Sequence, residues 1–190
     1  MSPSDITYAP ASSLKDFTGI LDLQQKNLPE AISEEEAQKE GFLTCRHDEG
    51  LLARMNTPYP HIIALYEGQV VGYVLVMQKS FRASFPVIEP MFVQIEKVVF
   101  KGQPLDVYNY VILGQVCIDK SFRGMRIFDN LYKHYRESLA SHFDYVITEV
   151  ASRNLPSLKA HWRVGFETIH TYTDPRGEDW EIVIWALNEQ

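Results

Sequence analysis

The first residues that could do chemistry lie in a turn between an apolar run and an amphipathic helical pattern. The apolar run spans Tyr110–Ile118, and the turn continues through Arg123 and Gly124 to Phe128. The first amides of a helix have no internal partners and carry the positive end of its dipole, so such a terminus binds anions, above all phosphate. The same pattern also suits an ordinary strand–turn–helix junction.

A second group of polar residues follows the next apolar run, Tyr145–Val150, which predicts another buried strand. Glu149 stands near the end of this run, and Asn154 can cap the helix pattern that follows it. His161 lies within that helix. Carboxylate and imidazole side chains are the usual groups for proton transfer, so this second strand–helix unit could supply acid–base chemistry.

Both units match the motifs of a known family. Residues 118–128 align without gaps with a motif in which Arg-Gly is followed, one residue on, by Gly, an aliphatic residue and Gly or Ala. Asn154, Ser157 and the pair Gly165-Phe166 match a second motif at the same spacing. At these residues the sequence resembles the GCN5-related N-acetyltransferase (GNAT) family. The resemblance covers about Tyr108–Leu187, and the N-terminal half agrees only in the order of its elements.

The resemblance implies a fold and an activity. The expected fold is a single α/β (mixed α+β) domain over residues 1–190, with a central mixed, mostly antiparallel sheet flanked by helices in three layers. The expected activity is transfer of an acetyl group from acetyl-CoA to a primary amine, of a small molecule or a polypeptide. Transfer would be direct, within a ternary complex, because no Cys or Ser lies in a nucleophile constellation.

The resemblance also implies where acetyl-CoA binds. The amides of the turn would hold the pyrophosphate, the free edge of the strand before the turn would pair with the pantetheine amides, and Asn154 would contact the pantetheine arm. The expected cofactor-binding residues are Val116, Cys117, Ile118, Arg123, Gly124, Met125, Arg126, Ile127, Phe128, Asn154 and Ser157.

Two catalytic roles follow from the same resemblance. Glu149 is the candidate general base, at a strand position where some members carry a catalytic Glu, and a salt-bridged carboxylate is the alternative. His161 stands where many members carry a general-acid Tyr, and a partly buried helix histidine is the alternative. Asn154 could serve as a helix cap alone.

Two residues depart from the family motif. Arg126 stands where the family has Gly, and Phe128 stands where it has Gly or Ala. Arg126 could direct its guanidinium to a phosphate or could be a solvated surface arginine. These departures motivate the alternative function, a catalytically impaired domain that binds or senses acyl-CoA.

The remaining pattern predicts the elements that position these residues. We expect a mixed sheet with helices packed on it. The expected strands are 6–9, 61–66, 70–78, 110–118, 145–150, 166–172 and 180–187. The expected helices are 14–23 (capped by Ser12 or Ser13), 33–40, one between 48 and 55, 92–99 (ended near Lys101-Gly102, although its residues also suit a strand), 127–139 and 154–165.

Composition limits the class of protein. A net charge of −7 and a pI near 5.4 argue against nucleic-acid or anionic-membrane partners. Cys45 and Cys117 have no metal-ligand spacing, so we expect no metal and a reducing cytoplasm. The N-terminus has no signal-peptide pattern and no run could span a bilayer. The expected partner is the amine acceptor, and strand 180–187, which we expect to have an exposed edge, could support a homodimer.

Overall fold

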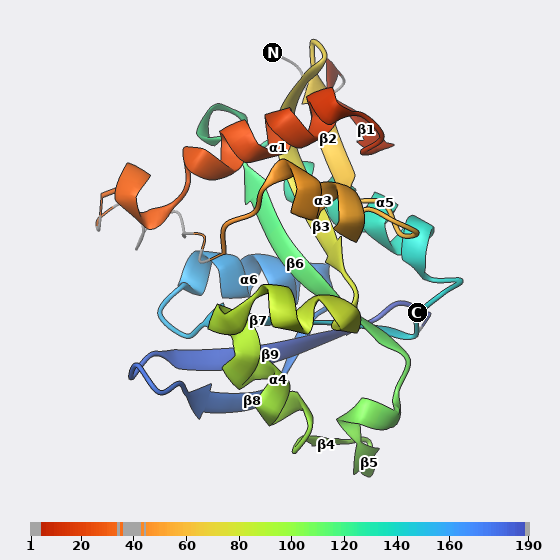
Figure 1. Cartoon of the computed structure of the whole chain (residues 1–190), viewed down its shortest axis with the longest axis vertical. Helices are drawn as coiled ribbons and strands as arrows, with labels where there is room; N and C mark the ends of the chain where they lie inside the picture. Colours follow the sequence, from red (N-terminus) through yellow and green to blue (C-terminus); the bar gives the residue numbers. More distant parts are fainter. Residues whose placement is uncertain (1–4, 34, 36–42, 44, 189–190) are drawn as a thin grey trace.

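The computed structural model describes residues 5–33, 35, 43 and 45–188 of the chain. Its centre is a seven-stranded sheet in the order β1-β2-β3-β6-β7-β9-β8, antiparallel at every step except β6–β7 (Figure 1). The sheet strands are β1 (Thr7–Pro10), β2 (Ile62–Tyr66), β3 (Gln69–Met77), β6 (Tyr110–Ile118), β7 (Tyr145–Ala151), β8 (Glu167–Thr173) and β9 (Asp179–Ala186). The helices are α1 (Leu14–Gln25), α3 (Glu49–Met55), α4 (Glu89–Ile95), α5 (Ile127–Leu139) and α6 (Leu155–Val164).

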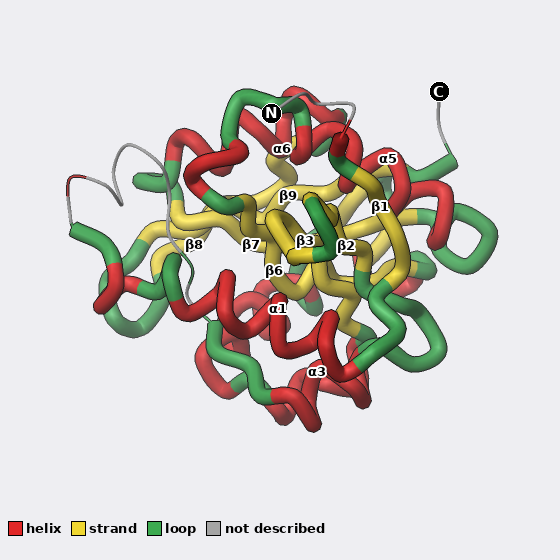
Figure 2. Tube along the Cα trace, turned by 90° about the horizontal axis from the view of Figure 1, so that it is seen from above, coloured by secondary structure: helices red, strands yellow, loops and turns green. Residues whose placement is uncertain are grey.

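Helices cover both faces of this sheet and make three layers (Figure 2). α5 and α6 pack on one face, where Val111 and Leu113 of β6 join their core. α1 and α3 cover the other face over β2 and β3, and α4 covers it over β6, β7 and β9. Side chains alternate between the two faces along each strand, so Ile112 faces α4 while its neighbours face α5. The three-layer fold expected from the sequence is confirmed.

α5 is the amphipathic helix that the sequence predicts after the turn. It buries one apolar stripe that includes Ile127, Leu131 and Tyr135 against the sheet. Gly72 of β3 lies under this stripe, where an added Cβ would come within 3.0 Å of Ile127 Cγ2 and 3.3 Å of Leu131 Cδ1. The missing side chain at Gly72 therefore lets the beginning of α5 approach the sheet closely.

Side chains cap the N-termini of α1 and α6. Ser13 begins α1 with a full capping box, in which its hydroxyl accepts from the Asp16 amide and the Asp16 carboxylate accepts in return. Asn154 caps α6, and Gly165 ends it in the left-handed conformation with φ 109°. The caps at Ser13, Asn154 and Gly165 are those that the sequence predicts, and α1 runs two residues beyond its predicted end at residue 23.

β6 and β7 part soon after they meet. Their parallel ladder covers only three residue pairs, from Tyr110 with Tyr145 to Ile112 with Ile147. A register shift between β3 and β6 leaves Gly114 as the extra residue of a β-bulge. After this bulge the alternation reverses, so Gln115 and Cys117 face α1 while Val116 packs on the α5 side.

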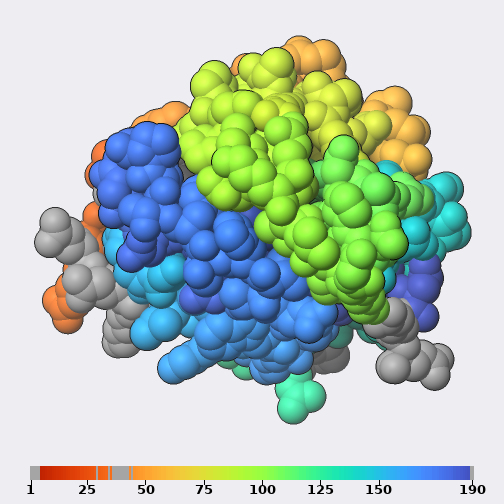
Figure 3. All heavy atoms as spheres, turned by 90° about the horizontal axis from the view of Figure 1, so that it is seen from below, coloured from red at the N-terminus to blue at the C-terminus, as the bar shows by residue number. Residues whose placement is uncertain are grey.

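A long insert joins β3 to its neighbour β6. Adjacent antiparallel strands need only a short hairpin loop, yet a long segment, residues 78–109, lies between β3 and β6. It forms two 3₁₀ turns, α4, a small hairpin of β4 (Val99–Phe100) and β5 (Gln103–Pro104), and a third 3₁₀ turn. Met91, Phe92 and Ile95 of α4 pack on Ile182 and Ile184 of β9. Figure 3 shows the insert, in yellow-green and green, against the blue C-terminal strands.

Two expectations are wrong, and one lies outside the described residues. The predicted helix over 92–99 runs from Glu89 to Ile95, and Lys101-Gly102 is the turn of the β4–β5 hairpin, with φ of 47° and 79° at its two residues, rather than a helix end. The strand predicted at 180–187 is no sheet edge, because β9 pairs with β7 on one side and β8 on the other, so a dimer through its edge is excluded. The helix predicted at 33–40 lies almost entirely outside the described residues.

We predict that Gly72→Val lowers the free energy of unfolding by about 1–3 kcal/mol, because the added methyl groups meet Ile127 and Leu131 beneath α5. Urea unfolding followed by circular dichroism measures the change. Gly50→Ala is the control, since an added Cβ on this exposed residue of α3 comes no closer than 3.4 Å to its neighbours. Equal losses for both variants would show that the contact under α5 is not tight.

We predict that Tyr135→Phe leaves the protein equally stable or more stable, by up to about 1 kcal/mol. Among the residues that the structure describes, Tyr135 Oη is the only side-chain oxygen or nitrogen that is fully shielded from solvent and has no hydrogen-bond partner. Deleting a buried hydroxyl that lacks a partner removes a desolvation cost without leaving another group unpaired. A clear loss of stability in the same urea experiment would contradict this and would indicate a partner for the hydroxyl in solution.

Candidate functional site

The turn before α5 has the backbone that its sequence motif predicts. Gly124 has φ 78°, and Arg126, the N-cap of α5, has φ 59° and ψ 22° in the left-handed region. Glycine adopts that region freely and other residues adopt it at a cost, which explains why the family motif has Gly at the position of Arg126. No side chain of the described residues caps α5, so its first amides are left to bind another acceptor.

Arginine side chains surround this terminus. Arg126 is exposed, and its side chain makes no ion pair or hydrogen bond with a described residue. Arg163 of α6 pairs with Asp129, with 2.8 Å between Nη2 and Oδ1, which offsets the carboxylate in the first turn of α5. The Arg123 guanidinium donates to Asn27 Oδ1 at 3.3 Å. The terminus therefore combines free amides with a surplus of positive charge.

A cavity of about 390 Å³ opens between the end of β6, this turn and α6. It brings together seven of the residues predicted to bind the cofactor. These are Val116, Cys117, Ile118, Arg123, Phe128, Asn154 and Ser157. Of the other four, Gly124 and Arg126 are exposed on the turn, Ile127 is buried between α5 and the sheet, and Met125 packs on the core, so the cavity is not lined by their side chains.

Five lining residues were missed by the sequence analysis. Pro156, Ala160 and Arg163 line the cavity from one face of α6, at the spacing expected for a helix face around Ser157, and this periodicity could have found them. Asn27 and Leu43 come from the N-terminal third, where no local pattern marks them. Tertiary folding alone brings these two to the site.

Phe128 lines the cavity, and its ring packs against a neighbouring aromatic ring. Its ring is stacked on Tyr132, with 4.5 Å between centroids and 23° between planes, and meets the His161 ring edge at 5.4 Å. The Arg163 guanidinium lies 5.7 Å from its centroid. The bulky residue thus joins the aromatic cluster beneath α5 and forms a wall of the cavity.

Asn154 has a structural role and a free donor. Its side-chain oxygen accepts from the Ser157 amide at 3.3 Å, so it caps α6 as the sequence predicts. The residue is buried and lines the cavity. No hydrogen bond from its Nδ2 to a described residue is found, so this amide can serve a ligand while the cap stays in place.

A narrow slot of about 90 Å³ continues from the cavity between the parted strands β6 and β7. The two spaces share Leu43, Val116, Asn154 and Ser157. Glu149 lies in the slot on the α4 side of the sheet. The slot therefore connects the cavity on the α5 side with a carboxylate on the opposite side.

Glu149 has the environment of a proton acceptor rather than of a salt bridge. Burial raises the pKa of Glu149 to about 7, and a hydrogen bond from Tyr172 opposes that rise. The Tyr172 hydroxyl donates to Glu149 Oε2 at 2.5 Å. Within the described residues no cation pairs directly with this carboxylate. A carboxylate with a pKa near neutral pH suits general-base chemistry.

His161 is buried with both ring nitrogens occupied. Nδ1 lies 2.8 Å from the Ser157 carbonyl oxygen, and Nε2 lies 2.7 Å from the Tyr132 hydroxyl. Because a carbonyl only accepts, Nδ1 carries the proton and Nε2 accepts from Tyr132. Burial lowers the pKa of His161 to about 4, so this environment favours the neutral ring over the imidazolium that a general acid requires.

A buried polar network supports the slot from the α1 side. Gln115, the residue after the bulge, accepts from Gln24 at 2.8 Å and from Tyr73 at 2.7 Å, and donates to the Cys45 carbonyl at 2.9 Å. Gln24 also lies 2.8 Å from His47 Nδ1. Every bond of this network crosses between elements, so it holds the free end of β6 in place.

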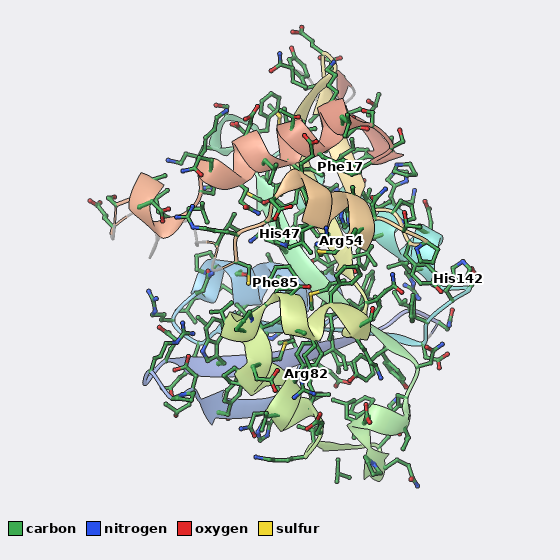
Figure 4. All side chains as sticks on the ribbon, viewed as in Figure 1. Phe17, His47, Arg54, Arg82, Phe85 and His142 are labelled. Carbon is green, nitrogen blue, oxygen red and sulfur yellow. The ribbon has the colours of Figure 1, made fainter. Side chains whose placement is uncertain are left out.

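The segment at His47 is fixed from a second side. The His47 ring meets that of Phe85, at the end of the first 3₁₀ turn of the insert, with 5.0 Å between centroids (Figure 4). Burial lowers the pKa of His47 to about 4, which keeps its Nδ1 available as an acceptor. The sequence analysis missed this network, since its members are ordinary polar residues far apart in the chain.

Other kinds of site are not found in the described part of the chain. It holds no group of three or more His, Cys, Asp or Glu side chains that could bind a metal ion. None of its helices combines the length and apolar character needed to cross a membrane. Cys45 and Cys117 are both buried, and burial raises the pKa of the Cys117 thiol to about 12, so it stays protonated.

Solved acetyltransferase structures share this fold. The chain superposes on the ribosomal-protein-S18-alanine N-acetyltransferase from Escherichia coli with a TM-score of 0.62 and 12% identity, over 97% of this chain and 96% of that one. A chain of the NatC complex bound to Gag peptide and CoA superposes with a TM-score of 0.65 and 13% identity, over 96% of this chain and 98% of that one. The structure of yncA from Salmonella typhimurium with its cofactor acetyl-CoA superposes with a TM-score of 0.61 and 16% identity, over 98% of this chain and 96% of that one. At these identities the likeness is one of fold.

Sequence comparison gives the family. No curated protein sequence matches the chain with significance. The family model described as the acetyltransferase (GNAT) family matches residues 18–166, which include the turn before α5, Glu149 and α6. With this match over most of its length, the chain belongs to the GNAT acetyltransferase family.

Proposed function

We propose that this protein transfers the acetyl group of acetyl-CoA to a primary amine by direct attack within a ternary complex. The observation that carries the proposal is the slot between β6 and β7, which joins the cavity at the α5 terminus to Glu149 on the other side of the sheet. A donor bound in the cavity and an amine beside Glu149 would meet there. The acceptor class comprises small amines and polypeptide amines.

The cavity residues suit the parts of acetyl-CoA. The free amides of the turn and of α5 would hold the pyrophosphate, with Arg126 close by to pair with it. Val116–Ile118 pair with β3 on one side, and β7 has already parted from them on the other, so backbone groups are available for the pantetheine amides. Asn154 would contribute its Nδ2 to the same arm.

The chemistry needs a base, because an alkylamine with a pKa near 10.4 is neutral in only about one molecule in 2,500 at pH 7. Glu149 takes a proton from the ammonium group, and the neutral nitrogen attacks the thioester carbonyl. The new C–N bond forms, the nitrogen releases its second proton to water, the C–S bond breaks, and the electron pair leaves on the CoA sulfur. A β6 amide at the parting polarises the carbonyl oxygen.

The leaving thiolate requires a hydrogen bond and then a proton. We assign the hydrogen bond to Ser157, whose hydroxyl lies in both cavity and slot and 3.4 Å from His161 Nδ1. His161 then orients Ser157 and α6 in its neutral form rather than acting as an imidazolium. Since a thiol has a pKa of about 8.5, water can supply the final proton near neutral pH.

The alternative function is an acyl-CoA-binding or sensing domain that has lost turnover. The departures at Arg126 and Phe128 motivate it. Release of free CoA thiol over a panel of small amines and peptides separates the two functions. Turnover with any acceptor supports the enzyme, and tight CoA binding with no turnover over the panel supports the sensor.

We predict that Glu149→Gln lowers kcat at least a hundredfold and leaves the Kd for CoA within about twofold. In the wild-type protein kcat/KM should rise as pH increases through about 7, because the base acts only when deprotonated and its pKa is about 7. That acid limb should be absent in the variant. Glu137→Gln, on the exposed face of α5, is the matched control. An unchanged pH profile in Glu149→Gln would remove Glu149 as the base.

We predict that Arg126→Ala weakens acetyl-CoA binding about three- to tenfold and leaves binding of S-acetylpantetheine unchanged, since only the former carries phosphates. Isothermal titration calorimetry measures both ligands. Arg54→Ala, an exposed arginine on α3, is the control for lost net charge. Equal losses for the two ligands, or equal losses in the two variants, would show that Arg126 does not contact the phosphates.

A further inference from the structure

Glu149, the base of the proposed reaction, accepts a hydrogen bond from a residue that lies two strands away in the sheet. The Tyr172 hydroxyl of β8 donates to Glu149 Oε2 of β7 at 2.5 Å, and β9 lies between these strands. Glu149 is paired with Ile182 of β9, and Tyr172 is paired with Trp180. All four side chains point to the α4 face, so the tyrosine reaches diagonally across β9 to the carboxylate.

A second β-bulge makes this reach possible. The register between β8 and β9 shifts between Thr168 and His170, which leaves Ile169 as an extra residue. Thr168 bonds Trp162 and Glu181 on the α6 side of the sheet, whereas Tyr172 beyond the bulge packs on the α4 side. Without the extra residue the period of two along β8 would turn Tyr172 away from Glu149.

Several titratable groups surround Glu149. Burial is the largest cause of its raised pKa, and Asp174 raises that pKa further, while Tyr172 and Arg176 lower it. Asp174 is itself held by its own loop, where its carboxylate accepts from the Arg176 and Glu178 amides and from the Arg176 side chain. The groups on neighbouring elements are His170, stacked on Tyr172 at 6.4 Å, and His161, whose lowered pKa keeps it neutral.

The Tyr172 hydroxyl directs its proton to Glu149, and not toward a leaving group. Burial and the adjacent Glu149 carboxylate raise its pKa above the ordinary value, so its hydroxyl keeps its proton over the working pH range. A hydroxyl that keeps its proton remains a hydrogen-bond donor to Glu149 throughout the cycle. Its contribution is therefore to the geometry and the basicity of the carboxylate.

We propose that Tyr172 is a positioning residue for the base: its hydroxyl holds Oε2 of Glu149 and leaves Oε1 to take the proton from the acceptor ammonium. This inference rests on the proposed function. In the step, the N–H bond of the ammonium breaks, an O–H bond forms on Oε1 and the nitrogen keeps the electron pair with which it attacks. The same hydrogen bond favours the charged carboxylate and so sets the pH at which transfer begins.

The test is Tyr172→Phe in the full chain, with pH profiles of kcat/KM and a direct titration of the carboxyl. Loss of the hydrogen bond should move the acid limb up by about one pH unit. The variant should then be about tenfold slower than wild type at pH 6 and within about twofold of it at pH 9. The side-chain carboxyl carbon of Glu149, observed by ¹³C NMR and assigned from its loss in Glu149→Gln, should titrate about one unit higher.

Tyr135→Phe is the matched control, because it removes a tyrosine hydroxyl from the other side of the sheet. It should leave unchanged both the acid limb of the kcat/KM profile and the titration of the Glu149 carboxyl. Adding Tyr172→Phe to Glu149→Gln should lower the rate no further, because Tyr172 acts through Glu149.

An unshifted carboxyl titration in Tyr172→Phe overturns the inference, and so does an equal loss of rate at every pH. These outcomes differ from failure of the proposed function. If Glu149→Gln keeps the acid limb, the base was assigned wrongly. If Glu149→Gln loses the acid limb while the Glu149 carboxyl of Tyr172→Phe titrates as in wild type, the base is supported and only the role of Tyr172 is disproved. The NMR titration reports on the hydrogen bond even where turnover is too slow to measure.

Discussion

β6 and β7 share a ladder of only three residue pairs, and beyond it the backbone groups on the facing edges of both strands must find other partners. Thr148 provides one, because its hydroxyl donates to the Leu113 carbonyl at 3.1 Å just past the last pair. The remaining edge of β6 stays open toward the cavity. The slot exists because these two strands stop pairing, and it opens into the cavity, so the parting is the feature on which the candidate site depends.

A parted strand needs support from elsewhere, and the two faces supply it differently. On the α5 side the support is apolar, with Val116 and Ile118 packed on the core. On the α1 side it is polar, through three hydrogen bonds of the Gln115 side chain. Buried polar groups are costly unless they are hydrogen-bonded, and these three bonds join Gln115 to α1, to β3 and to the segment at Cys45. The network therefore fixes one position of β6 instead of merely stabilising the fold.

Much of the fold and part of the site follow from local sequence. The apolar runs, the caps at Ser13 and Asn154 and the stripe of α5 are signals within a few residues, and the structure has them where they were expected. The N-terminal contributions of Asn27 and Leu43, the Gln115 network and the Tyr172 contact carry no such signal. They depend on strand order and on two bulges, which change which face a residue points to without changing its type. The error at Lys101-Gly102 has a local cause, because a glycine after a lysine suits a helix end and a hairpin turn equally.

The insert at residues 78–109 has a consequence for the order in which the molecule folds. β2–β3 and β8–β9 are joined by short loops and can pair as soon as their own residues meet. β3 and β6 are equally close neighbours in the sheet, but their pairing must close a loop that spans the whole insert, and such closure costs more entropy as the loop lengthens. The middle of the sheet should therefore assemble after its outer hairpins, and the apolar side of α4 would be exposed to solvent until it does.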